Sequence, residues 1–210
     1  MSKNQSKRQV ESSVKDENLI EKRRTEMIQG AVKLFKQKGF HRTTTREIAK
    51  EAGFSIGTLY EYIRTKEDVL YLVCDNIYRE VSSRLANLPT EAGTIEGLRA
   101  SIRQYYLLID SMSDEILVMY QESKSLKKDA LRYVLTKEFE MVRLFENLLA
   151  GCVQSGELTL SEKEINLISN NIVVQGQTWA FRRWAFRRNY TIDDYIDMQT
   201  SIFLNGILKK

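Results

Sequence analysis

The sequence contains few of the residues that interrupt helices. Pro89 is its single proline, and it has ten glycines among 210 residues. A β-sandwich or β-barrel needs a turn signal about every 8 to 12 residues, and this chain has too few of them. The scarcity of turn residues therefore predicts an all-α protein.

Cysteine and histidine are also scarce. Cys74 and Cys152 lie far apart and outside any C-x-x-C spacing, so we expect reduced, packed thiols and no disulfide, metal or redox site. The one histidine, His41, lies in a basic turn and is a poor basis for a metal centre or a Ser/His/Asp triad. No Gly-rich phosphate loop or nucleophile–base pair is present. Neither an enzyme nor a cofactor is expected.

Long apolar runs are missing. No stretch approaches the roughly 18 residues that a membrane span requires, and no signal-peptide pattern opens the chain. The sequence therefore predicts a cytoplasmic protein with no membrane partner.

Charge is distributed unevenly along the chain. Residues 1–66 hold 15 Lys and Arg against 8 Asp and Glu, a net charge of +7, whereas the remainder has a net charge of −3. A basic N-terminal third is typical of a nucleic-acid-binding module joined to something else. A solvated basic face is the alternative.

The chain divides into three parts by composition. Residues 1–17 are polar and of mixed charge, which predicts a mobile N-terminal arm. Residues 18–88 hold a helix at 19–38, two short helices and a connecting helix, and they end at a polar break that contains Pro89. Residues 89–210 are expected to form an antiparallel helical bundle. Its helices are expected at residues 95–109, 115–121, 129–154, 162–187 and 192–208.

The segment Gly39–Lys66 contains two short helices joined by a turn at Gly53. Thr44 and Glu47 form a capping-box pattern at the start of the first helix, and Ser55 is suited to cap the second. Glycine tolerates the backbone that a tight turn between steeply crossing helices requires. The segment predicts a helix-turn-helix, a unit whose second helix enters the major groove of DNA.

Several side chains of this unit suit contacts to DNA. Thr45 and Arg46 open the first helix, where a hydroxyl can bind a phosphate and a guanidinium can reach O6 and N7 of a guanine. The first turn of the second helix lies closest to the base edges, and tyrosine and lysine side chains beyond it can donate to phosphates. The alternative is that the tyrosines are core aromatics and the threonines only cap helices. The expected DNA-binding residues are Thr45, Arg46, Ser55, Ile56, Gly57, Thr58, Tyr60, Tyr62 and Lys66.

The run Thr44–Glu67, T-x-x-E-I-A-x-x-A-G-x-S-x-G-T-L-Y-x-Y-x-x-x-K-E, resembles the N-terminal DNA-binding region of TetR-type bacterial regulators. So dense a pattern is far more specific than a lone short motif. Ile63 departs from the family, in which an aromatic is common, and we expect the departure to alter packing but not groove contacts. The resemblance implies that Thr45, Arg46, Ser55, Thr58, Tyr60, Tyr62 and Lys66 occupy positions that commonly contact DNA.

The resemblance also implies a homodimer. In the family the last two helices of each subunit form a four-helix bundle at a twofold axis, and here these would be residues 162–187 and 192–208. An ordinary core within one chain is the alternative. The expected interface face consists of Ile165, Ile168, Ile172, Gln175, Trp179 and Phe186, met by Tyr195, Ile202 and Phe203.

Aromatic and methionine residues are concentrated between these regions, where they either line a ligand cavity or form a plain core. The block WAFRRWAFRR, residues 179–188, adds four arginines. These either snorkel at the surface or hold the anionic head of a ligand with an apolar tail, such as the fatty acyl-CoA that some family members respond to. The expected ligand-binding residues are Tyr105, Ile109, Met112, Tyr120, Phe145, Trp179, Arg182 and Arg183.

The sequence thus predicts a one-component transcriptional regulator. It is expected to bind a palindromic operator in double-stranded DNA as a homodimer, to repress, and to be released by a small apolar effector. The alternative is a TetR-like protein whose output is protein–protein interaction, with DNA serving only to position it.

Overall fold

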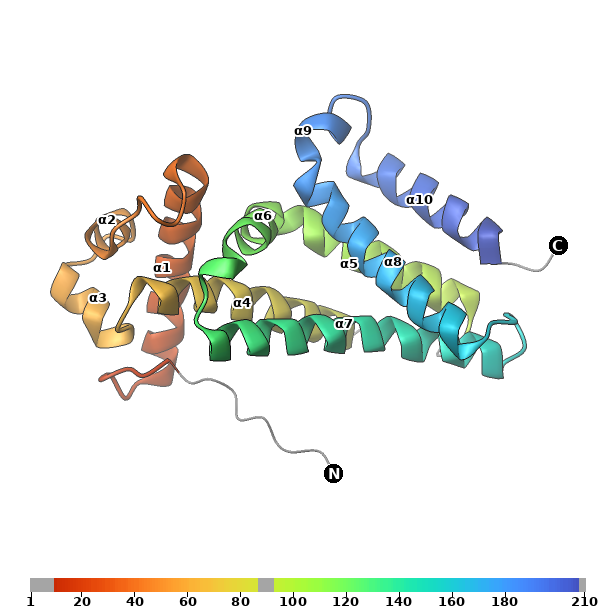
Figure 1. Cartoon of the computed structure of the whole chain (residues 1–210), viewed down its shortest axis with the longest axis horizontal. Helices are drawn as coiled ribbons and strands as arrows, with labels where there is room; N and C mark the ends of the chain where they lie inside the picture. Colours follow the sequence, from red (N-terminus) through yellow and green to blue (C-terminus); the bar gives the residue numbers. More distant parts are fainter. Residues whose placement is uncertain (1–9, 87–92, 208–210) are drawn as a thin grey trace. The chain divides into compact units, whose positions relative to one another are not determined.

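The computed structural model describes residues 10–86 and 93–207, and all regular structure within them is helical (Figure 1). The predicted all-α fold is confirmed. The helices are α1 (Glu17–Lys38), α2 (Thr45–Glu51), α3 (Ile56–Tyr62), α4 (Lys66–Ala86), α5 (Ile95–Ser111), α6 (Ser113–Glu122), α7 (Lys128–Gln154), α8 (Glu162–Phe181), α9 (Arg183–Phe186) and α10 (Ile192–Ile207), with a 3-10 turn at Ser123–Ser125.

Contacts divide the chain into two compact units. The first contains residues up to Ile77 together with Leu117–Thr136, and the second contains Tyr78–Ile116 and the residues from Lys137 onward. The predicted boundary near residue 88 lies outside the described residues. The assignment of Leu117–Thr136 to the first unit depends on tertiary contacts, which no local pattern in the sequence indicates.

Most helix starts follow local rules that the sequence displays. Thr44 and Glu47 form both hydrogen bonds of a capping box at α2, and Ser161 and Glu164 do the same at α8. The start of α1 lies two residues earlier than expected, because the side chain of Asp16 accepts the Leu19 N–H as an N-cap.

The predicted helix over residues 162–187 is wrong in its last part. α8 ends at Phe181, Arg182 has non-helical angles (φ −111°, ψ 19°), and the short α9 follows. No glycine or proline lies at this break, so no local sequence pattern predicts it. Contacts to α5 and α6 hold both sides of the break and are described below.

The first unit is built around α1, which packs against α2 and α3 (Figure 1). Ile48 on α2 and Leu59 on α3 are fully buried, as is Ile63 just after α3. Ile63 therefore fills the core as expected at the position where it departs from the family.

The second unit has α5 packed against α8 and α10. Gly176 lies at the α5–α8 crossing, where a Cβ atom would come within 2.6 Å of Tyr105 Cε1 and 3.0 Å of Tyr106 Cδ1. The glycine is therefore required by close packing. Tyr105 and Phe145 are both fully buried beside each other, with ring centroids 5.4 Å apart.

Both cysteines are free and buried, in agreement with the sequence analysis. Burial raises the pKa of the Cys74 thiol to about 12, so this thiol stays protonated near neutral pH. Among the helices that the structure describes, none combines the length and the apolar character needed to cross a membrane.

Candidate DNA-binding site

The turn between α2 and α3 has the geometry of a helix-turn-helix. Gly53 has a φ of +76°, a value that residues with a side chain rarely adopt, and the Phe54 N–H donates to the Ala49 carbonyl at 2.7 Å. These contacts end α2 and redirect the chain into α3, which begins one residue after Ser55.

Four of the predicted DNA-binding side chains are paired in the free protein. Thr45 Oγ1 and the Tyr60 hydroxyl share a hydrogen bond of 3.1 Å that joins the start of α2 to the middle of α3. Ser55 Oγ accepts the Thr58 N–H at 3.0 Å and also lies 3.0 Å from Thr58 Oγ1. Tyr60 keeps 51% of its surface exposed. The hydrogen bonds of both pairs fix the positions of these hydroxyls at the surface of α2 and α3.

Arg46, Ile56 and Gly57 occupy the parts of α2 and α3 that remain open. Arg46 is exposed and makes no ion pair with any residue in the described parts of the chain. A Cβ atom on Gly57 would meet only Ser55 Oγ, at 3.6 Å, which is ordinary contact. Among the residues that the structure describes, none is close enough to exclude a side chain at position 57, whereas a close approach to a DNA groove would exclude one.

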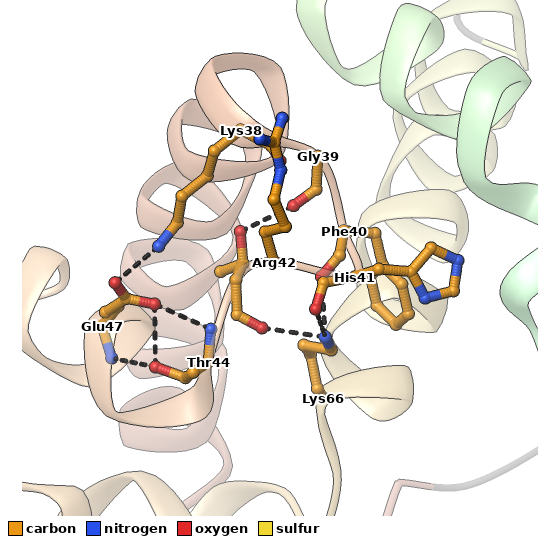
Figure 2. Close-up of polar contacts among 9 residues, drawn as sticks. Lys38, Gly39, Phe40, His41, Arg42, Thr44, Glu47 and Lys66 are labelled. Carbon is orange, nitrogen blue, oxygen red and sulfur yellow. Dashed lines mark hydrogen bonds and ion pairs between the residues drawn. The ribbon is translucent and has the colours of Figure 1, made fainter.

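Lys66 makes a different set of contacts from the one expected. Its Nζ donates to the backbone carbonyls of Phe40 (2.7 Å), Thr43 (2.8 Å) and His41 (3.3 Å) (Figure 2). It also lies 4.3 Å from the centroid of the Phe40 ring. An ammonium has three N–H donors, and all three have acceptors here. Lys66 thus stabilises the turn before α2, and a phosphate contact would require it to release a carbonyl.

Tyr62 also differs from its expected role. Only 3% of its surface is exposed, so the side chain is part of the core of the first unit. This placement agrees with the alternative of a core aromatic. A phosphate contact from its side chain would require Tyr62 to leave that core.

The start of α2 is fixed by a charged cluster that includes Lys38 at the end of α1. Glu47 accepts the Thr44 N–H at 2.9 Å and the ammonium of Lys38 at 2.5 Å (Figure 2). The hydrogen bond from Lys38, followed by those from Thr44, lowers the pKa of Glu47 from 4.5 to about 2. Glu47 therefore carries its charge at any pH near neutrality.

Two residues that the sequence analysis did not select contact the turn before α2. The carboxylate of Glu122, at the end of α6, accepts the Phe40 N–H at 3.2 Å, and Ser125 Oγ lies 3.3 Å from Nε2 of His41. Both contacts join segments more than 80 positions apart, so no local pattern could have indicated them.

The expected ligand-binding residues are divided between core and surface. Tyr105, Ile109, Met112, Phe145 and Trp179 are buried in the second unit. Tyr120 belongs to the first unit and exposes 64% of its surface. Five of the expected residues therefore belong to the core of the second unit, and Tyr120 is a surface residue of the first.

Two of the four arginines of the WAFRRWAFRR block, Arg183 and Arg187, are anchored by acidic residues of α5 and α6. Asp110 accepts both the Trp179 Nε1–H and the guanidinium of Arg187, each at 2.7 Å. Asp114 pairs with Arg183 at 2.8 Å. Arg182 is exposed and stacks over Trp184, with 5.6 Å from the guanidinium carbon to the ring centroid. Asp110 and Asp114 thus hold the chain on both sides of the break that follows α8.

Comparison with known proteins identifies the family. Residues 27–71 match the model of bacterial regulatory proteins of the tetR family, and residues 91–181 match a tetracyclin repressor-like C-terminal domain. The chain belongs to the TetR family. In TetR-family terms, α2 and α3 are the helix-turn-helix. The match to the C-terminal domain includes Leu117–Thr136 of the first unit, and the rest of it lies in the second unit.

Three relatives illustrate the likeness of this TetR-family chain to known regulators. The HTH-type transcriptional regulator HbdR of Aromatoleum sp. (strain CIB) is 29% identical over 90% of this chain and 82% of its own length. The HTH-type transcriptional repressor KstR2 of Rhodococcus jostii (strain RHA1) is 26% identical over 88% and 91%. The structure of AibR in complex with isovaleryl coenzyme A and operator DNA has a TM-score of 0.69 at 20% identity, covering 86% of this chain and 97% of that one.

The apolar face that the TetR-family chain exposes differs from the one expected at a dimer interface. Ile172, Trp179 and Tyr195 are between 1% and 4% exposed and belong to the core of the second unit. Ile202 is exposed as expected. The large apolar side chains that α8 and α10 expose by half or more are Leu167, Val174, Met198 and Ile202.

No group of three or more His, Cys, Asp or Glu side chains in the described part of this chain is arranged to hold a metal ion.

Proposed function

We propose that the chain is a one-component repressor that binds a palindromic operator as a homodimer through α2 and α3. The observation that carries the proposal is the open surface on these helices, where Arg46, the Thr45–Tyr60 pair and Gly57 are accessible and their backbone is fixed by caps. Arg46 supplies a base-reading guanidinium, and the hydroxyls supply phosphate contacts. The repressor KstR2 among the relatives supports the sign of regulation.

Homodimerisation is proposed through the exposed apolar residues of α8 and α10. Leu167 and Val174 lie seven positions apart on α8, and Met198 and Ile202 lie four apart on α10, so each pair shares one side of its helix. An apolar surface of this kind is typical of a protein interface. A dimer would supply two recognition helices, one for each half-site of an operator whose half-site centres lie about 34 Å apart.

The proposed effector is an acyl-CoA. To release DNA, it must bind the DNA-free conformation of the dimer more tightly than the DNA-binding conformation. The AibR complex supports this class of ligand. Arg182 is the candidate for an anionic group, because it is exposed, whereas Arg183 is already paired with Asp114. The acyl part would have to displace apolar side chains of the second unit, because Tyr105 and Phe145 are fully buried and packed against each other.

Genomic footprinting tests the proposal, followed by transcription from the recovered promoter. The full-length protein should lower transcription, and isovaleryl-CoA or a longer acyl-CoA should restore it, whereas free coenzyme A should not. Arg182→Ala should weaken release, and Arg188→Ala, which removes another exposed charge of the same block, should not. Full release of the Arg182→Ala variant would contradict the anionic-head assignment, and the absence of any footprint would contradict the repressor itself.

A further inference from the structure

The last backbone carbonyls of the recognition helix α3 have no donors within the helix. It has seven residues, and Ile63, which follows it, is extended (φ −144°, ψ 164°) rather than turned back by a glycine. The Ile63 N–H donates to the Leu59 carbonyl at 3.3 Å. An α-helix leaves its last four carbonyls without partners inside the helix. The carbonyls of Glu61 and Tyr62 can therefore accept hydrogen bonds from water or from other segments of the chain.

Residues Val10–Val14, here called the N-terminal brace, supply some of these donors. The Ser12 hydroxyl and the Ser13 N–H each donate to the Glu61 carbonyl at 2.9 Å, and the Ser13 hydroxyl lies 3.3 Å from the same oxygen. These contacts join segments 48 or 49 positions apart in the sequence. The brace thus acts as a C-cap that comes from outside the helix.

Arg24 on α1 completes the arrangement. Its guanidinium donates to the Tyr62 carbonyl at 3.3 Å and to the Val10 carbonyl at 2.5 Å, so one side chain bridges α3 and the brace. Hydrogen bonds from a charged donor are stronger than those between neutral groups.

The brace itself is held in place by further contacts. The Val10 side chain is 7% exposed, which anchors the brace in the core of the first unit. Glu11 forms an ion pair with Arg64, two residues after α3. The part of the predicted mobile arm that the structure describes is therefore in contact with the recognition helix.

We propose that the N-terminal brace and Arg24 are positioning residues for operator recognition. They fix the C-terminal end of α3 and thereby the direction in which its first turn, from Ser55 to Thr58, meets the base edges. A helix of two turns is unstable alone, because nucleation costs more than so few hydrogen bonds return. Loosening one end therefore affects the whole helix. The inference rests on the proposed function, since it assigns the brace a part in DNA recognition.

The test compares full-length variants that remove the donors one set at a time. Arg24→Met removes the guanidinium and keeps an unbranched stem, Arg24→Lys restores one charged donor, and Ser12→Ala/Ser13→Ala removes the two hydroxyls. Lys22→Met is the matched control, because it removes an exposed cation from the same helix. Amide hydrogen exchange of α3 is measured together with affinity for two probes. These are the duplex that the wild-type protein enriches from random DNA and a shuffled duplex.

Arg24→Met should accelerate exchange in the last turn of α3 roughly 5- to 30-fold, the factor that one or two kcal/mol represents. The ratio of affinities for the enriched and shuffled duplexes should fall by a similar factor. Arg24→Lys should restore part of the exchange protection and part of the affinity ratio. The serine double variant should change both quantities in the same direction but less. Lys22→Met should change neither the exchange nor the affinity ratio.

A merely structural contribution would lower the unfolding temperature and leave the affinity ratio of the folded protein unchanged, and that result would overturn the proposal. Unchanged exchange in α3 for both Arg24→Met and the serine variant would also overturn it. If no duplex is enriched by the wild-type protein, the proposed function fails, and the exchange measurement still decides whether the brace caps α3.

Discussion

At the scale of single residues, Lys66 connects the start of α4 to the turn that precedes α2. Its three carbonyl acceptors and the Phe40 ring surround one ammonium group. Hydrogen bonds that involve a charged group contribute about 1.5 to 3 kcal/mol each to stability. The turn from Phe40 to Thr43 leads directly into α2, so Lys66 stabilises the segment that precedes this helix.

Lys66→Met should therefore lower the free energy of unfolding by at least about 2 kcal/mol, because three backbone carbonyls lose a charged donor. It should leave the salt dependence of DNA binding unchanged, because Lys66 donates to carbonyls and not to a phosphate. Loss of a phosphate contact would change the slope of log affinity against log salt by about 0.9. Urea unfolding and DNA binding at several salt concentrations measure the two effects. If the slope of log affinity against log salt falls by about one per protomer and the stability is unchanged, Lys66 contacts a phosphate as the sequence analysis predicts.

Residue roles could be predicted where the partners are close in sequence. Thr44 and Glu47 lie three positions apart, and their capping box was recognisable because the pattern is local. Lys66 and its acceptors are 23 to 26 positions apart, and Lys38 and Glu47 come from different helices. A cation on a DNA-binding unit is equally compatible with a phosphate or a buried carbonyl until the fold is known.

At the scale of helices, the capping box of α2 gives the first unit a specific dependence on acid. The folded pKa of Glu47, about 2, lies below its ordinary value of 4.5. A carboxyl with a lowered folded pKa stabilises the folded state above the unfolded pKa, and this contribution is lost as the pH falls toward the folded pKa.

The wild-type protein should therefore lose stability between about pH 4.5 and pH 2 more steeply than Glu47→Gln. At neutral pH the variant should be the less stable of the two, by an amount limited by solvent screening. Chemical unfolding at a series of pH values gives the free energy of unfolding of each protein. The difference between the two free energies isolates Glu47, because the other carboxyls contribute equally to both proteins. Parallel curves for the two proteins would show that the Glu47 charge does not stabilise α2.

The crossing of α5 and α8 depends on Gly176. Gly176→Ala should destabilise the second unit by about 1 to 3 kcal/mol, because Tyr105 is fully buried and cannot move away from the new methyl group. Gly206→Ala on α10 is the matched control, since a Cβ there meets nothing within 4 Å. Thermal unfolding compares the two, and equal stability of both variants would refute the close approach.

The ends of helices were predictable only where the chain carries a cap or a breaker. The starts of α2, α8 and α10 follow from Thr44, Ser161 and Thr191. The break after Phe181 has no such signal, because it depends on Asp110 and Asp114, which pair with side chains on both sides of it. Tertiary contacts of this kind override local helix propensity.

At the scale of the whole molecule, α8 has two apolar faces, one buried within the chain and one exposed. Ile172 is 2% exposed and packs within the chain, whereas Val174 is 51% exposed. Periodicity identifies α8 as helical but does not determine which of its apolar faces is internal. Three residues of the interface face predicted from the sequence, Ile172, Trp179 and Tyr195, are therefore buried within the chain, and the interface itself stays a prediction.

Val174→Glu should convert the proposed dimer to a folded monomer, because the carboxylate would be placed without a partner in an apolar interface. Ile172→Glu should instead unfold the second unit, since the charge would be buried inside it. Sedimentation gives the oligomeric state and circular dichroism gives the helical content. A dimeric Val174→Glu variant would place the interface elsewhere, and a folded monomeric Ile172→Glu variant would favour the face predicted from the sequence.

The most direct test of the central claim, that two copies of the helix-turn-helix read one operator, is selection of binding sites from random DNA. The full-length protein is used, and the mass of the complex on the enriched duplex is then measured. We expect a palindromic sequence with half-site centres about 34 Å apart, bound by two protomers. Enrichment of no sequence, or of an asymmetric sequence bound by one protomer, would contradict the account.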